Sequence, residues 1–254
     1  MALARPVSVA ATKITVAPIA PSGNAQNQPS LLVVNDLAAT LTGPAWPDGS
    51  LLLPTDTEFP LLDVNFCGEA MPFDKADVVS RWKRVFTLFR PQSPRIDALQ
   101  KRADAFFPMV DSTLAAYDIP ADFRYIPLAE SDLIPRAVSP KGAGGYWQLM
   151  PGTARDLGLK VGGKHDERFN TKKATVAACR YLRRLYDLFG SWTLVAAAYN
   201  VGPGYVKNQL KKQVSRDYYQ LALPRETRYY LFRVLLYKEI LSRPTDYTAF
   251  LTGA

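Results

Sequence analysis

The segments that decide the fold are IPLAES, residues 126–131, and KGAGGYWQLMP, residues 141–151. In the first, Glu130 closes an apolar run, and in the second a glycine-rich turn leads to two aromatic residues and a glutamine. The apolar neighbours of Glu130 should desolvate its carboxylate, which disfavours the charged form and raises the pKa. An acid tuned in this way can donate a proton near neutral pH. Spacing alone leaves a second interpretation equally open, in which Glu130 is a helix-end residue in a salt bridge.

From Phe73 onward, apolar residues recur at helical spacing. The pattern places Glu130 on the same face as Phe123 and Ile126, in a helix that begins near Pro120 and that Pro127 should bend just before the glutamate. The predicted helices cover about residues 74–89, 96–117, 120–130, 151–158, 171–189, 192–199 and 225–241. We therefore predict a mainly α fold.

Residues 1–66 differ in composition from the rest of the chain and are rich in Pro, Ser, Thr and Ala. Short apolar runs at residues 31–34 and 51–53 could pair as strands, but two such runs are too little for an independent core. We expect a Pro-rich, extended and partly ordered N-terminal arm over residues 1–66, followed by one helical domain over residues 67–254.

The charge balance is basic, with 31 Lys+Arg against 23 Asp+Glu and a formal net charge of +8. Such a surface favours a polyanionic partner. The basic residues Lys207, Lys211, Lys212 and Arg216 have no nucleic-acid motif around them, so we predict a solvated helix face and no nucleic-acid partner. No apolar run approaches the roughly 18 residues that span a bilayer, and the first residues do not form a convincing signal peptide.

Few residues in the chain are suited to metals or redox chemistry. Cys67 and Cys179 lie far apart in the sequence, and they are either a disulfide or two separate thiols with Cys179 buried in a helix. His165 is the single histidine and is expected in a surface loop. This excludes a His-based metal cluster, and no cofactor or metal is expected.

Three later segments carry polar groups that suit a cleft: GYWQ at residues 145–148, AYNVG at 198–202 and ETRYY at 226–230. The amide of Gln148 both donates and accepts hydrogen bonds, whereas Trp147 is more typical of a core. The other two segments sit where a helix ends and where one begins, so each is equally explained by capping.

The order of these motifs, from Glu130 to residues 226–230, resembles that of the lytic transglycosylase (SLT) family, glycoside hydrolase family 23, and most of all its membrane-bound D branch. The resemblance covers about residues 73–247. It implies a lysozyme-like helical fold of the goose-type lysozyme/SLT kind. It also implies cleavage of the β-1,4 bond between N-acetylmuramic acid and N-acetylglucosamine in peptidoglycan, with formation of 1,6-anhydro-N-acetylmuramic acid.

The same resemblance implies roles for individual residues. Glu130 matches the catalytic acid and base, and Ser131 its supporting neighbour. The residues implied to contact the substrate, besides Ser131, are Gln148, Tyr146, Trp147, Tyr199, Asn200 and Tyr230. Peptidoglycan strands and other cell-wall enzymes are the implied partners, and the periplasm of a bacterial cell envelope is the implied location.

Two positions depart from the family pattern. Tyr146 stands where a smaller aliphatic residue is usual. Asp132 stands where a small or apolar residue is commoner, and its charge would raise the pKa of Glu130 further if the two side chains lie close.

The motifs offer one carboxylate, whereas the usual glycosidase uses two. One is enough if the C6 hydroxyl of the substrate is the nucleophile, because proximity within one sugar replaces a bound water. A hydrolytic muramidase of the same fold is the alternative, and its second carboxylate would be Asp132, Asp156, Asp166 or Glu167. A non-catalytic peptidoglycan-binding or assembly protein is the remaining alternative.

Overall fold

The computed structural model describes Phe59 and residues 63–252 of the 254-residue chain. Most of the predicted N-terminal arm, including the apolar runs at residues 31–34 and 51–53, lies outside the described residues. The described part begins with a hairpin of β1 (Asn65–Phe66) and β2 (Glu69–Ala70), paired antiparallel. The arm was predicted to end at Phe66, and this position lies inside the hairpin.

The rest of the described chain is helical, as predicted. The α-helices are α2 (Ala76–Phe89), α3 (Ile96–Ala116), α4 (Ile126–Ser131), α5 (Pro151–Asp156), α6 (Thr171–Phe189), α7 (Trp192–Val201), α8 (Pro203–Gln213), α9 (Arg225–Ser242) and α10 (Pro244–Thr252). Short 3-10 turns connect them, namely η1 (Arg90–Arg95), η2 (Ala121–Tyr125), η3 (Gly163–His165) and η4 (Glu167–Phe169).

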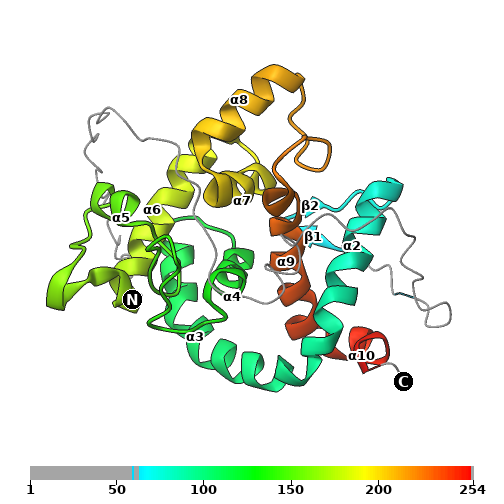
Figure 1. Ribbon diagram of the computed structural model, residues 1–254, viewed down its shortest axis with the longest axis horizontal. Coiled ribbons are helices and arrows are strands. Elements are labelled where there is room, and N and C mark those ends of the chain that lie inside the picture. Colours follow the sequence, from blue (N-terminus) through cyan, green and yellow to red (C-terminus); the bar gives the residue numbers. More distant parts are fainter. Residues whose placement is uncertain (1–58, 60–62, 253–254) are drawn as a thin grey trace, which may run out of the picture.

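The short helix α4 lies in the middle of the molecule, where longer helices surround it (Figure 1). It packs against α9 and η2, while α7 packs against α6, α8 and α9, and α3 against α6. Along α9 nearly every residue from Tyr230 to Leu241 is buried, as expected of a helix that contacts neighbours on all sides. Helix α9 is therefore the central support against which α4 is placed.

Local sequence signals explain where the long helices begin and end. Asn170 caps α6, because its side chain accepts a hydrogen bond from the backbone N–H of Lys173 at 3.0 Å. Gly190 ends the same helix in the left-handed conformation, which glycine adopts without a steric penalty. Pro108 lies inside α3, and the helix continues through it.

The predicted helix over residues 120–130 is in fact two elements, η2 and α4. Pro127 lies in the first turn of α4, where its missing N–H leaves no intrahelical bond unmade. The prediction that Pro127 bends a continuous helix was therefore wrong: the proline helps to start a new one.

Helix α10 was not predicted. It starts at Pro244 and buries Tyr247, Phe250 and Leu251. Because the preceding helix ends before a proline, the sequence pattern favoured a stop there, but a proline suits the first turn of a following helix equally well.

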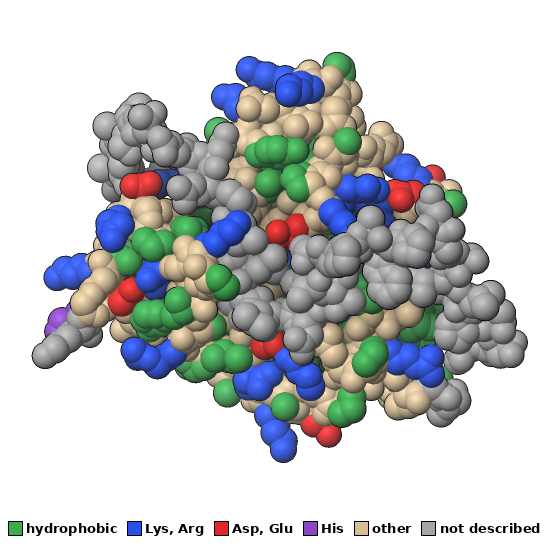
Figure 2. All heavy atoms as spheres, viewed as in Figure 1, with side chains coloured by type: hydrophobic (Ala, Val, Ile, Leu, Met, Phe, Trp, Pro, Cys, Tyr) green, Lys and Arg blue, Asp and Glu red, His purple; other side chains and the backbone are tan. Residues whose placement is uncertain are grey.

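The basic residues late in the chain lie on and just after α8. Lys207, Lys211 and Lys212 are exposed, and Figure 2 shows Lys and Arg side chains over this helix at the top of the molecule. The prediction of a solvated helix face is confirmed for these three lysines. Arg216 lies beyond α8 and donates to the backbone carbonyl of Phe189 at 2.5 Å.

One carboxylate connects the hairpin to the N-terminus of α7. Glu69 on β2 accepts hydrogen bonds from the backbone N–H groups of Trp192 and Thr193 and from the hydroxyl groups of Ser191 and Thr193. An acidic side chain at this end of a helix satisfies free N–H donors and complements the helix dipole. Glu69 therefore joins the first described residues to a helix more than 120 positions away.

Replacing Glu69 by alanine should destabilise the protein by about 1–3 kcal/mol, because several donors at the start of α7 would lose their acceptor. Urea unfolding of the variant measures the change. Asp74→Ala is the matched control, since Asp74 is exposed and its loss should change the free energy of unfolding by less than about 0.5 kcal/mol. Equal effects of the two substitutions would contradict the capping role.

Candidate active site

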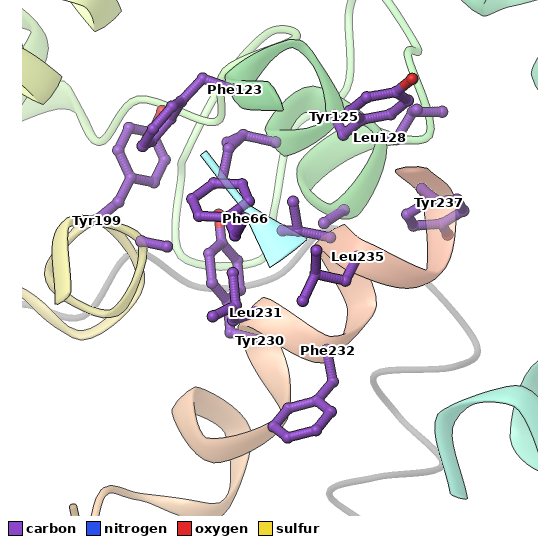
Figure 3. Close-up of a cluster of buried hydrophobic side chains, with 14 of the residues drawn as sticks. Phe66, Phe123, Tyr125, Leu128, Tyr199, Tyr230, Leu231, Phe232, Leu235 and Tyr237 are labelled. Atoms are coloured by element: carbon purple, nitrogen blue, oxygen red, sulfur yellow. The ribbon is translucent and has the colours of Figure 1, made fainter. Parts of the chain in front are cut away.

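Glu130 is the buried acid at the centre of the site. Its side chain is 4% exposed, near the C-terminal end of α4. The hydroxyl of Tyr230, on α9, donates a hydrogen bond to Oε1 of Glu130 at 2.6 Å. Figure 3 shows Tyr230 on the side of α9 that faces α4, whereas Phe232 points to the opposite side. The structure thus brings together two residues that lie 100 positions apart in the sequence.

The pKa of Glu130 is raised from 4.5 to about 7. Burial is the main cause, because it removes the carboxylate from water. The hydrogen bond from Tyr230 and the positive charge of Arg233 lower the pKa, whereas the negative charge of Glu226 raises it further. The balance leaves an acid that is partly protonated at neutral pH.

Asp132 has partners of its own on other elements. Its carboxylate pairs with Arg95 and accepts a hydrogen bond from the hydroxyl of Tyr237 at 3.1 Å. The acid that acts on Glu130 is Glu226 in the first turn of α9. That the charge of Asp132 also raises the pKa of Glu130 stays a prediction.

A polar network connects the end of α7 to the start of α9. The amide of Asn200 donates to Oε1 of Glu226 at 3.0 Å, and its oxygen accepts from the hydroxyl of Thr227 at 2.8 Å. The hydroxyl of Tyr199 donates to the backbone carbonyl of Trp147 at 2.5 Å. Burial and then the charge of Glu130 raise the pKa of Tyr199 well above 10. Tyr199 and Asn200 therefore bond to the glycine-rich loop and to the start of α9, while their contact with a substrate stays a prediction.

A small pocket adjoins these residues and is lined by Gln148, Leu149, Met150, Thr153, Tyr181, Tyr199 and Gly202. Gln148 is buried and has a positive φ of 44°, a conformation rarely adopted by residues other than glycine. Its Nε2 donates to the carbonyls of Gly145 at 2.7 Å and Ala137 at 3.1 Å, whereas its Oε1 has no hydrogen-bond donor within the described chain. Gln148 therefore fixes the glycine-rich loop and keeps one buried acceptor without a donor.

Arg168 also bonds to the glycine-rich loop. Its guanidinium donates to the carbonyls of Gly142 at 2.6 Å and Leu149 at 3.1 Å, and it forms an ion pair with Asp166 at 2.7 Å. A Cβ added to Gly145 would lie 2.2 Å from the carbonyl oxygen of Arg168. Glycine is thus required at this position because two backbone segments approach closely.

The remaining predicted site residues make contacts within the protein interior near the site. Ser131 is fully buried, and its hydroxyl bonds to the carbonyls of Pro127 at 2.9 Å and Tyr146 at 3.0 Å. Trp147 is also fully buried and donates to the hydroxyl of Thr175 at 3.0 Å. This burial confirms the interpretation of Trp147 as a core residue, and the substrate contact that the resemblance implies for it stays a prediction. Half-buried Tyr146 packs on Phe106, with ring centroids 4.6 Å apart.

Several residues of the site could not be found from the motifs. Arg233 lies one turn after Tyr230 on α9, and Arg168 lies in the 3-10 turn η4. Both are buried arginines, which are rare unless they have a structural or electrostatic task. Glu226 was read as part of a helix cap, and only the packing of α9 shows that it acts on Glu130.

The two cysteines and the histidine lie apart from this site. Cys67 and Cys179 are both free thiols, and burial raises the pKa of Cys179 to about 12. His165 is exposed in η3. Among the described residues there is no group of three or more His, Cys, Asp or Glu side chains arranged to hold a metal ion.

In the same part of the chain, no helix is long and apolar enough to cross a membrane.

Comparison with protein families gives one match. Residues 112–222 match the family model described as the transglycosylase SLT domain. This match includes Glu130, Gln148 and Asn200, and it ends just before α9.

Two curated proteins share substantial sequence with the chain. Membrane-bound lytic murein transglycosylase D of Escherichia coli strain K12 is 33% identical over 151 residues, which cover 58% of this chain and 33% of that protein. Peptidoglycan transglycosylase gp16 of Escherichia phage T7 is 34% identical over 128 residues, which cover 49% of this chain and 9% of that protein. The match thus spans only a third or less of the length of either relative.

Among solved structures, the 70-kDa soluble lytic transglycosylase of Escherichia coli overlaps with a TM-score of 0.47 at 25% identity, covering 69% of this chain and 29% of that one. An inactive mutant of the lytic transglycosylase Slt from Pseudomonas aeruginosa overlaps with a TM-score of 0.46 at 26% identity. The overlap covers 55% of this chain and 24% of that one.

The raised pKa of Glu130 has a consequence for stability. Between pH 4.5 and about 7 the native state keeps a proton that the unfolded state has released, so the contribution of this group to stability falls as the pH rises through that window. Glu130→Gln removes this effect. At pH 8 we expect the free energy of unfolding of the variant to be about 1–3 kcal/mol higher than that of the unmodified protein, and at pH 4 we expect the two values to differ little. Urea unfolding at both pH values measures the difference.

Glu167→Gln is the control for this experiment. The backbone N–H of Lys160, and then the side chain of Lys173, lower the pKa of Glu167, so its replacement should give no gain at pH 8. An equal gain for Glu130→Gln at both pH values would contradict a raised pKa of Glu130.

Gly145→Ala should destabilise the protein by more than about 2 kcal/mol, because the added Cβ collides with backbone and the residue has a φ of 75°. Gly152→Ala is a matched control in α5, where an added Cβ meets nothing within 4 Å. It should be neutral or stabilising by up to about 1 kcal/mol. Thermal unfolding of both variants tests the close approach at Gly145, and equal melting temperatures would refute it.

Proposed function

We propose that this protein is a peptidoglycan lytic transglycosylase, a proposal supported by the match of residues 112–222 to the transglycosylase SLT domain and by the similarity to a lytic murein transglycosylase. It would cleave the β-1,4 bond between N-acetylmuramic acid and N-acetylglucosamine and leave a 1,6-anhydro-N-acetylmuramic acid end. The observation that carries this proposal is the buried carboxyl of Glu130, with a pKa of about 7 and a hydrogen bond from Tyr230.

In the first step, protonated Glu130 gives its proton to the glycosidic oxygen. The bond from C1 of the muramyl residue to that oxygen breaks, and the N-acetylglucosamine part leaves with a free hydroxyl group. The 2-acetamido group of the muramyl residue stabilises the positive charge that develops at C1. A pKa near the working pH favours this step, because a large fraction of the acid is protonated and is still willing to lose its proton.

In the second step, the Glu130 carboxylate removes the proton from the C6 hydroxyl of the same sugar. The C6 oxygen forms a bond to C1 and closes the 1,6-anhydro ring, so that no water is consumed and Glu130 returns to its protonated state. Because nucleophile and electrophile belong to one residue, the protein needs only to hold the sugar in a conformation that brings them together.

Other residues would assist this reaction. The hydroxyl of Tyr230 stabilises the Glu130 carboxylate between the two steps through the bond described above. Asn200 and Tyr199 are placed at the end of α7, beside the pocket and the network of Glu226. Gln148 lines the pocket, and its Oε1 atom is a buried acceptor with no hydrogen-bond donor within the described chain.

A hydrolytic muramidase is the second candidate, since Glu226 places another carboxylate within electrostatic reach of Glu130. The four acids proposed from the sequence are less suited. Asp166 and Glu167 pair with Arg168 and Lys173, Asp132 pairs with Arg95, and Asp156 is exposed on α5. In a hydrolase, Glu226 would activate a water molecule.

The proposed substrate also implies a location. Peptidoglycan strands lie in the bacterial cell envelope, so we propose that the protein acts there, in the periplasm, alongside other cell-wall enzymes. The net charge of +8 suits an anionic polymer of this kind.

Digestion of purified peptidoglycan sacculi followed by mass spectrometry of the muropeptides tests the proposal. We expect products one water lighter than hydrolysed muropeptides, formed by the unmodified protein and lost in Glu130→Gln. Glu226→Gln is run in parallel, and it should keep the anhydro products, because the lytic reaction uses no second carboxylate.

Three outcomes would contradict the proposal in different ways. Reducing-end products that depend on both Glu130 and Glu226 would identify a hydrolase. Anhydro products that persist in Glu130→Gln would assign the reaction to another acid. Binding to sacculi without any product would identify a peptidoglycan-binding protein.

A further inference from the structure

Helix α9 contacts α4 through two tyrosines that lie seven residues apart. Tyr230 donates to Glu130 at 2.6 Å, and Tyr237 donates to Asp132 at 3.1 Å. Seven residues are close to two helical turns, so the two rings lie on the same side of α9, about 10 Å apart along its axis. Figure 3 shows both tyrosines on the part of α9 next to the ribbon that carries Leu128 of α4.

The carboxylate of Asp132 has a second partner on another element. Arg95, the last residue of η1, forms an ion pair with it, and Arg95 also donates to Gln92 at 2.7 Å. The Asp132 side chain is 5% exposed, whereas that of Arg95 is 35% exposed. Asp132 thus connects the segment between α2 and α3 to α9, at a point two residues after Glu130.

The backbone at this point needs such a support. Asp132 and Leu133 both have positive φ values, of 48° and 56°. Left-handed conformations are sterically unfavourable for residues with a side chain, and Asp tolerates them better than Leu. Helix α4 itself has only six residues, too few to be stable without tertiary contacts. Its orientation therefore depends on what holds its two ends.

We propose that Arg95, Asp132 and Tyr237 form a positioning device that fixes the C-terminal end of α4 and thereby holds Glu130 against Tyr230. None of the three is assigned a contact with substrate. They act through Glu130, by making the left-handed turn after Ser131 the preferred conformation. The part of this inference that concerns catalysis rests on the proposed function.

The alternative is that Tyr237 and Asp132 only stabilise the fold, and the chain offers a matched control for it. Tyr247 on α10 donates to Glu239 of α9 at 3.2 Å. This is also a buried tyrosine–carboxylate pair, but it lies away from α4. Tyr247→Phe should lower stability to a similar degree as Tyr237→Phe and should leave turnover unchanged.

The test is a double-mutant cycle between Tyr237→Phe and Tyr230→Phe, read out as kcat and KM on soluble peptidoglycan strands. Tyr237→Phe alone should lower kcat roughly fivefold to fiftyfold with little change in KM, since misplacement of a catalytic group has effects of this order. In the Tyr230→Phe background the same change should lower kcat less than twofold, because the contact it protects is already absent.

A second readout does not require activity. The pKa of Glu130 can be followed by NMR of the 13C-labelled carboxyl group, assigned by its absence in Glu130→Gln. Loss of the Tyr230 bond removes an interaction that lowers this pKa, so Tyr237→Phe should raise it above about 7. In the Tyr230→Phe background, Tyr237→Phe should not raise the pKa of Glu130 further.

The outcomes separate the two proposals. If the unmodified protein cleaves no peptidoglycan but Tyr237→Phe shifts the pKa of Glu130 as expected, the proposed function is wrong and the positioning device stands. If Tyr237→Phe changes only the melting temperature, as Tyr247→Phe does, the positioning role is refuted. Equal losses of kcat in both backgrounds would refute it as well.

Discussion

Burying the carboxylate of Glu130 beside the hydroxyl of Tyr230 is the constraint on which the rest of the structure depends. An isolated buried carboxylate is strongly unfavourable, and a folded protein tolerates it only through protonation, pairing or hydrogen bonding. Here all three contribute, because burial favours the protonated form, Arg233 supplies positive charge and Tyr230 donates a hydrogen bond. Two of these residues come from α9, and this explains why that helix is buried along most of its length and why α4 is placed against it.

The glycine-rich loop meets a second constraint, which concerns backbone rather than side chains. Gly145 approaches the backbone of Arg168 too closely for a Cβ, and Gln148 adopts a left-handed conformation. Such strain persists only where surrounding contacts outweigh it. The guanidinium of Arg168 and the amide of Gln148 supply these contacts by bonding to carbonyl groups of the same loop. The loop is thus a preformed wall of the pocket.

Much of the helical framework could be predicted from the sequence, because helix ends carry local signals. Asn170 and Gly190 mark the ends of α6 through their own hydrogen bonding and backbone preference, and Ser191 does the same for α7. The separation of η2 from α4 and the existence of α10 were missed for a common reason. Each depends on whether a proline begins or ends a helix, and a local pattern does not distinguish the two cases.

The site was predictable only in part, for a different physical reason. The apolar run before Glu130 correctly indicated desolvation and a raised pKa. The same reasoning could not find Glu226 or Arg233, since their effect on Glu130 arises from how α9 packs on α4. For Trp147 the residue type favoured a core position whereas the family resemblance implied a substrate contact, and its indole is fully buried against Thr175. Aromatic residues serve cores and binding surfaces equally well, and only the tertiary structure separates the two.

The effects that raise and lower the pKa of Glu130 also suit the two steps that we propose for this residue. An acid that protonates a leaving group and then acts as the base should have a pKa near the working pH, since a much higher value would leave too little drive to lose the proton and a much lower one too little carboxylic acid. Burial raises the pKa of Glu130, and without an opposing effect the carboxyl would hold its proton more tightly in the first step. Tyr230 and Arg233 lower the pKa, and both residues belong to α9. The geometry of a single helix therefore determines both where the acid lies and how strongly it holds its proton, and a change in the packing of α4 on α9 would alter the two properties together.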